Sequence, residues 1–181
     1  GKVEELRSTL SDEQIQLSTD EFLYMKVDHP RSFIEADKNV GDWFVKPLPA
    51  GAIHNGAGAI RQVGRVAFFH HGNEFLRRVD RIASDLYHQG LKNLMQNARS
   101  EIKGAKTDFD LSDAMEIYVC GSLAGGTGSG TFIDVGIILR NKMPRALISG
   151  FFLLDWVYRD KAFAYRVAGN TYAALTELDS L

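Results

Sequence analysis

The residues with the clearest chemical potential lie in one short stretch, Gly125 to Gly130, which holds four glycines in six positions. Glycines let a backbone come close to an anion, and the free N–H groups at the start of a helix point toward it. Thr127, Ser129 and the following Thr131 add hydroxyl groups that can donate hydrogen bonds. These residue types in this order indicate a loop that binds phosphate.

The segments around this stretch favour the same interpretation. Met115 to Cys120 is an apolar run that predicts a buried strand, and Phe132 to Leu139 is apolar enough to predict a largely buried helix. Arg145 to Leu154 predicts a second strand, which ends at Asp155. A strand, a helix and a strand in this order predict a parallel sheet.

Two standard phosphate-binding motifs do not fit. Gly125 to Gly130 has the spacing of a Walker loop, but Thr131 and Phe132 follow where lysine and serine or threonine are needed. Gly126 and Gly128 would start a dinucleotide-binding fingerprint, but threonine occupies its last position. The acid at the end of the second strand, residue 155, keeps a dinucleotide interpretation open, because an acid there can hold a ribose.

A second motif precedes the first. Gly56-Ala57-Gly58-Ala59 is followed four residues later by Gly64-Arg65 and then, one residue on, by Ala67. Small residues of this kind let backbone N–H groups approach an anion, although alone they predict an ordinary glycine turn before a helix. Arg61 and Arg65 nearby either supply positive charge, face solvent or pair with a carboxylate.

Together the two motifs resemble the tubulin/FtsZ superfamily. Its signature after a strand is Gly-Gly-Gly-Thr-Gly-[Ser/Thr]-Gly, which stands here as Ala124-Gly125-Gly126-Thr127-Gly128-Ser129-Gly130, with alanine in the first position. FtsZ-like proteins also carry the Gly-Ala-Gly-Ala pattern with its Gly-Arg and Ala, and residues 56–67 match it at each of those positions. The resemblance covers most of the chain, and these two motifs are its specific part.

The resemblance implies a bound guanine nucleotide, GTP or GDP, with Mg²⁺. It implies that the nucleotide is contacted by Ala57, Gly58, Ala59, Gly125, Gly126, Thr127, Gly128, Ser129, Gly130 and Asp155. It also places Asp28 near the metal ion, since Asp28 follows a predicted strand, Glu21 to Val27, that Pro30 closes. From the residues alone, Asp28 is more simply a turn residue at a strand end.

The activity implied is that of a GTP-binding domain that hydrolyses GTP when it assembles head-to-tail into filaments. The catalytic acidic loop would come from a neighbouring subunit, so no catalytic residue is assigned and the isolated chain is expected to be nearly inactive. Two other interpretations stay open: a non-hydrolysing interaction module with the same fold, and a nicotinamide-dependent oxidoreductase. The sequence does not decide between GTP and ATP.

The chain has 181 residues, of which 45% are hydrophobic, enough for one buried core. We expect a single partial domain over residues 1–181, an α/β fold with a Rossmann-like, mostly parallel sheet flanked by helices. This is the tubulin/FtsZ GTPase-domain type, here without its first strand and its C-terminal half. The net charge of -2 indicates no nucleic-acid or membrane partner, and the single cysteine favours a reducing, cytoplasmic location.

The remaining segments are less informative. Lys2 to Leu10 has helical spacing, and Arg31 to Ile53 is a poorly patterned connection. Phe75 to Ile102 predicts long amphipathic helical structure that could break at Gly90. Phe163 to Leu178 predicts a closing helix. Its Asn170 resembles an asparagine at a similar place in tubulin, and no role is assigned to it.

Overall fold

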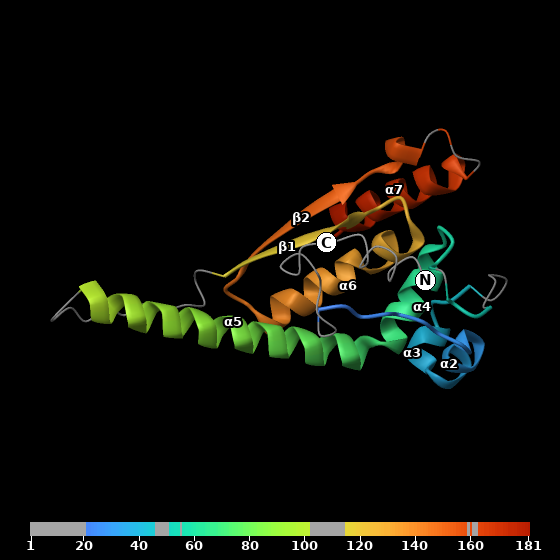
Figure 1. The fold of residues 1–181 in the computed structure, drawn as a ribbon. Helices are drawn as coiled ribbons and strands as arrows, with labels where there is room; N and C mark the ends of the chain where they lie inside the picture. The colour runs from blue at the N-terminus through green and yellow to red at the C-terminus, as the bar shows by residue number, and fades with distance from the viewer. Residues whose placement is uncertain (1–20, 46–50, 55, 102–114, 159, 161–162) are drawn as a thin grey trace, which may run out of the picture.

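A computed structural model describes residues 21–45, 51–54, 56–101, 115–158, 160 and 163–181, so the helix expected at Lys2 to Leu10 lies outside the described residues. Its elements follow one another along the chain in Figure 1. In order they are α2 (Pro30–Ala36), α3 (Lys38–Gly41), α4 (Arg61–His70), α5 (Gly72–Glu101), β1 (Glu116–Ser122), α6 (Gly126–Lys142), β2 (Leu147–Leu153), the 3₁₀ helix η2 (Asp155–Tyr158) and α7 (Ala164–Asp179).

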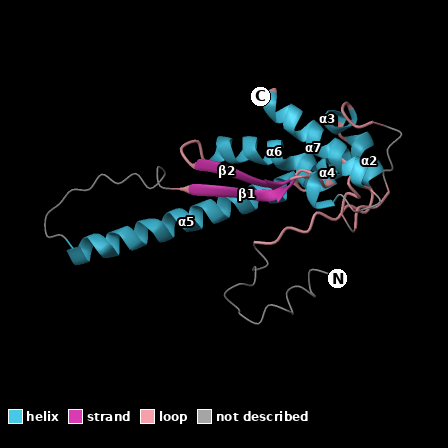
Figure 2. Cartoon of the chain, turned by 90° about the horizontal axis from the view of Figure 1, so that it is seen from above, coloured by secondary structure: helices cyan, strands magenta, loops and turns pink. Residues whose placement is uncertain are grey.

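The two strands confirm the predicted α/β unit. β1 and β2 pair in parallel from Glu116 opposite Leu147 to Ser122 opposite Leu153. The chain connects them through α6, which packs along the sheet, while α5 extends well beyond it (Figures 1 and 2). Because the strands are parallel, the residues that follow each of them, including the glycine run, lie at the same edge of the sheet.

The expectation that the first strand is buried is wrong. Side chains of β1 alternate, with Tyr118 and Cys120 exposed and Val119 partly buried. Leu147 and Phe151 of β2 are exposed beside them, at 60% and 59% of their surface. Within the described residues, α6 covers one face of the sheet and leaves the other open. Burial therefore alternates from one residue to the next along the strand, because successive side chains point to opposite faces.

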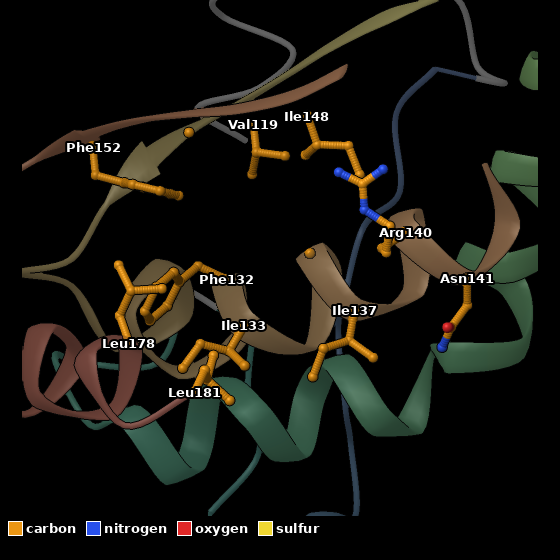
Figure 3. Close-up of a pocket in the computed structure, with 12 residues that line it drawn as sticks. Val119, Phe132, Ile133, Ile137, Arg140, Asn141, Ile148, Phe152, Leu178 and Leu181 are labelled. Carbon is orange, nitrogen blue, oxygen red and sulfur yellow. The ribbon is translucent and has the colours of Figure 1, made fainter. Parts of the chain in front are cut away.

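Two clusters of buried side chains form the core. The larger joins α2, α3 and α4, and its buried members are Val27, Val40, Phe44, Ile53, Ala57, Val63, Val66 and Ala67. The smaller joins the end of β1 to α6 and α7 through Leu123, Phe132 and Ala174. A cavity of about 490 Å³ lies between the sheet and α6, lined by apolar side chains that include Val119, Phe132 and Phe152 (Figure 3).

The strand expected at Glu21 to Val27 needs correction, and two possibilities that the sequence left open are decided. Glu21 to Val27 is extended but forms only one antiparallel bridge, Val27 with Ile53, because no described strand lies beside residues 21–26. The connection from Arg31 contains two short helices, of which α2 starts at Pro30, a residue suited to a first helical position. α5 continues through Gly90, since one glycine costs a helix only about 1 kcal/mol.

Candidate functional site

The two glycine motifs meet where α4 crosses the start of α6. A Cβ atom on Gly64 would lie 2.3 Å from the carbonyl oxygen of Gly126, and one on Gly130 would lie 2.3 Å from that of Arg61. A Cβ on Gly126 would lie 2.6 Å from the backbone nitrogen of Ile60. The helices therefore approach backbone to backbone, which only glycine permits at these positions.

Close packing also explains Gly128, whose Cβ would lie 2.3 Å from the carbonyl oxygen of Ser122. Gly125 differs, because a Cβ there would meet no described atom within 4 Å. The sequence explained these glycines by the close approach of an anion, and the structure gives three of them a second reason. Gly126, Gly128 and Gly130 leave room for the protein's own backbone, and Gly125 is the glycine of the run whose Cβ would meet none of the described atoms.

The glycine run is not a loop followed by a helix, as the sequence suggested. α6 begins at Gly126 with Gly125 as its N-cap, so most of the run is the first turn of the helix. Backbone N–H groups in a first turn have no acceptor within the helix. No described side chain caps these groups, and the turn carries no acidic residue, whereas Arg140 and Lys142 lie in the last turn. The start of α6 therefore offers donors and positive potential to an anion.

The hydroxyl groups of the run are used mainly within the helix. Ser129 is almost fully buried, and its Oγ donates to the carbonyl oxygen of Gly125. The Oγ1 of Thr131 donates to the carbonyl oxygen of Thr127 over 2.9 Å. Thr127 itself is partly exposed and lines a cavity of about 210 Å³ beside Ala57. In this structure it is therefore the backbone of the run, more than its hydroxyls, that is available to a ligand.

The second motif forms a tight turn before α4. Gly56 and Gly58 have positive φ values of 94° and 56°, which glycine adopts without strain. Ala59 also has a positive φ, 58°, in the left-handed region that costs a residue with a Cβ about 1–2 kcal/mol. Ala57 is buried, and Gly58 is exposed. This turn needs support from the rest of the fold to hold Ala59 in its conformation.

Asn170, to which the sequence assigned no role, provides part of that support. Its side chain is buried on α7, and its Nδ2 donates to the carbonyl oxygens of Ala59, at 2.9 Å, and Ala124, at 2.8 Å. One side chain thus bridges the two motifs. The sequence contained an indication of this role. Asn170 is a polar residue on the same helical face as Val167 and Ala174, where an apolar residue is expected.

The two arginines form carboxylate pairs, one of the alternatives that the sequence left open. Arg61 contacts Glu177 of α7 at 2.8 and 2.5 Å and also donates to the carbonyl oxygen of Ser129. Arg65 makes two 2.8 Å hydrogen bonds to Asp134 of α6. Both arginines join α4 to a neighbouring helix, so their charge is already compensated by a carboxylate.

Asp28 is exposed and lies close to the side chains of Lys26 and His54. Its Oδ1 is 2.9 Å from Nζ of Lys26 and 2.8 Å from Nε2 of His54. The hydrogen bond with Lys26, and then that with His54, holds the pKa of this carboxyl below its usual value. In the described part of the chain, no group of three or more histidines, cysteines and acids could hold a metal ion. Asp28 could supply only one ligand, which suits Mg²⁺ when phosphates and water complete its shell.

Asp155 lies where the sequence predicted. It follows β2 as the first residue of η2, at the same edge of the sheet as the glycine run. Its side chain is partly buried. The structure thus brings the two motifs together directly, and it places Asp155 after the neighbouring strand. Asp28 contacts His54, which precedes the second motif in the sequence.

A parallel α/β sheet with a glycine-rich helix start at the ends of its strands is the architecture of a tubulin-like domain. The family model described as "Tubulin like" matches residues 4–181, and the chain belongs to this family. No match was found among curated proteins or among solved structures. Of the helices that the structure describes, none combines the length and the apolar character needed to cross a bilayer.

Proposed function

We propose that this chain binds GTP with Mg²⁺ at the start of α6, and that it hydrolyses GTP when copies of the chain assemble head-to-tail. The observation that carries the proposal is the first turn of α6. None of the described side chains caps its backbone donors, a Cβ on Gly125 would meet no atom of the described residues within 4 Å, and the second glycine motif packs directly against the turn. Membership of the tubulin-like family supports a guanine nucleotide as the ligand.

Each candidate residue has a role in this proposal. The backbone of Gly125 to Gly130 binds phosphate oxygens, and the turn at Ala57 to Ala59 closes over the terminal phosphate. Asp155, after the neighbouring strand, holds the ribose. Asp28 supplies one Mg²⁺ ligand through Oδ2, since both of its described contacts, with Lys26 and His54, use Oδ1. Displacing Lys26 as well would cost little, because an exposed ion pair contributes little free energy.

Hydrolysis is the second part of the proposal. An acidic group from the next subunit would activate the attacking water, so catalysis depends on contact between copies. A head-to-tail contact joins two different surfaces of the same chain, and repeating it generates an open filament. Turnover per molecule should therefore rise steeply with protein concentration. Binding without such turnover would favour the non-hydrolysing interaction module.

The binding test uses Gly125→Asp with Gly125→Asn as its matched control. Gly125 has φ −78° and ψ 166°, so both replacements fit the backbone, and both residues are good helix N-caps. They have nearly the same shape, but aspartate carries a negative charge and no donor, so a carboxylate at this position repels phosphate. Gly126 is unsuitable for the test, because any side chain there would displace the backbone of Ile60.

The measurement is calorimetric titration of the chain with GTP in magnesium, with thermal unfolding of each variant alongside. We expect Gly125→Asp to keep the wild-type unfolding temperature and to bind GTP at least about tenfold more weakly than Gly125→Asn, the equivalent of about 1.4 kcal/mol. Equal affinity of the two variants would mean that the start of α6 does not bind phosphate.

A further inference from the structure

The two glycine motifs are far apart in the sequence, and a single buried amide joins them. Asn170 lies 111 residues from Ala59 and 46 from Ala124, and it donates to both of their carbonyl oxygens. Asn170 is only 8% exposed. Ala59 belongs to the turn of the second motif, and Ala124 immediately precedes Gly125 at the start of α6.

The chemistry of this contact is restrictive. Two carbonyl oxygens accept hydrogen bonds and cannot donate them, so the group between them must donate twice. The NH₂ of an asparagine does this with one atom. A carboxylate of the same shape offers only acceptors, and a hydroxyl offers one hydrogen. Among side chains of this shape, only an amide meets this requirement.

The two acceptors are also the points at which the motifs need to be fixed. Ala59 has a left-handed backbone that must be held by its surroundings. The carbonyl of Ala124 lies just before the N-cap, so a hydrogen bond to it fixes where the first turn of α6 begins. By donating to both, Asn170 links the turn to the helix start.

We propose that Asn170 is a positioning residue that holds the turn at Ala57 to Ala59 and the start of α6 at the separation required for both to contact one phosphate chain. This inference rests on the proposed nucleotide binding and adds the means by which the two motifs act together. Asn170 acts through the backbone of the motifs and contacts no phosphate itself. Its loss should weaken discrimination between nucleotides that differ in their terminal phosphate.

The same helix provides a matched control. Thr171, the next residue, is also polar and buried, and its Oγ1 has no hydrogen-bond partner within the described part of the structure. Thr171→Val keeps the shape of the side chain and removes a hydroxyl that bonds to nothing described. It should therefore leave both the fold and nucleotide binding unchanged, in contrast to replacements of its neighbour.

The experiment compares wild type, Asn170→Asp, Asn170→Ser and Thr171→Val by titration with GTP and with GDP. All titrations are done at a temperature where circular dichroism shows each protein to be folded. For both Asn170 variants we expect GTP to bind at least about tenfold more weakly, because Asn170→Ser loses one of the two hydrogen bonds and Asn170→Asp loses both. We also expect their ratio of GTP to GDP affinity to fall, because the turn closes over the terminal phosphate.

The outcomes separate the two proposals. If wild type binds no nucleotide, the proposed function fails and this role fails with it. If wild type binds GTP and the folded Asn170 variants keep its affinity and its preference over GDP, nucleotide binding stands and the positioning role is overturned. If the Asn170 variants unfold at a lower temperature but bind nucleotide as wild type does, the positioning role is also overturned, because Asn170 then contributes only to stability.

A measurement on the wild-type chain covers the case in which neither Asn170 variant folds. Hydrogen exchange is followed at the amides of residues 57–60 and 122–127 with and without GTP. If the two motifs are held as one unit, GTP should slow exchange in both segments over the same concentration range. Protection of one segment alone would overturn the proposal.

Discussion

Replacing Gly64 by alanine tests whether the glycines are required for packing. The Cβ of Gly64→Ala would lie 2.3 Å from the carbonyl oxygen of Gly126 and 2.7 Å from the Cα of Thr127. Ordinary contact begins at 3.4 Å, so α4 and α6 would have to separate by about 1 Å. Both obstructing atoms belong to the backbone, so no side-chain rotation can relieve the contact.

The magnitude follows from two opposing terms. Overpacking of a core costs about 1–3 kcal/mol, and a contact between backbones belongs at the upper end of this range. Alanine in place of glycine inside a helix raises the free energy of unfolding by about 1 kcal/mol. We therefore expect Gly64→Ala to lose about 2 kcal/mol of stability, which lowers the unfolding temperature of a chain of this length by about 4–8 °C.

Gly136 in the middle of α6 is the matched control. A Cβ there would meet no described atom within 4 Å, so Gly136→Ala should only gain helix propensity. Its unfolding temperature should rise by about 2–4 °C, the effect of about 1 kcal/mol. Thermal unfolding followed by circular dichroism measures both variants. A rise in unfolding temperature for both would refute the claim that α4 and α6 meet backbone to backbone.

Two further predictions concern the charged groups. Asp134→Asn removes the charge from the carboxylate that pairs with Arg65 and should lower stability by about 1–2 kcal/mol, measured by urea unfolding; an unchanged midpoint would show that the pair contributes nothing. The lowered pKa of Asp28 makes this carboxyl a source of stability that is fully present above its ordinary pKa of 3.8 and is lost as the pH falls through the lower pKa of the folded state. The stability of Asp28→Asn should therefore depend less steeply on pH below 3.8 than that of wild type. Identical acid-unfolding curves for the two proteins would contradict the lowered pKa of Asp28.

Local sequence patterns were sufficient for the main secondary structure near the site. The apolar runs predicted β1 and β2, and the helical spacing after Phe163 predicted α7. These patterns are reliable because they depend on the periodicity of neighbouring side chains. The same patterns placed the start of α6 too late, at Phe132. Glycine has a low helix propensity, and the contacts of Gly126 and Gly130 with α4, which lie outside any local window, are found only in the folded chain.

Expectations that depended on distant partners were less successful. Residues 21–26 have a strand pattern, but a strand also needs a neighbour for its backbone hydrogen bonds, and no described strand provides one. The burial of β1 was overestimated for a related reason. The pattern of an apolar run does not reveal whether one face of a sheet or both will be covered.

The sequence alone determined the family of this chain and the order of its two glycine motifs, because both are properties of residue types along the chain. The tertiary structure decided how those residues are used. In the folded chain Gly64, Gly126 and Gly130 lie in the contact between α4 and α6, whereas Gly125 has no contact of this kind with the described residues. The tertiary structure also brought Asn170 to the junction of the motifs. A hydrogen bond between residues 111 positions apart leaves no local pattern, so only the folded chain could show it.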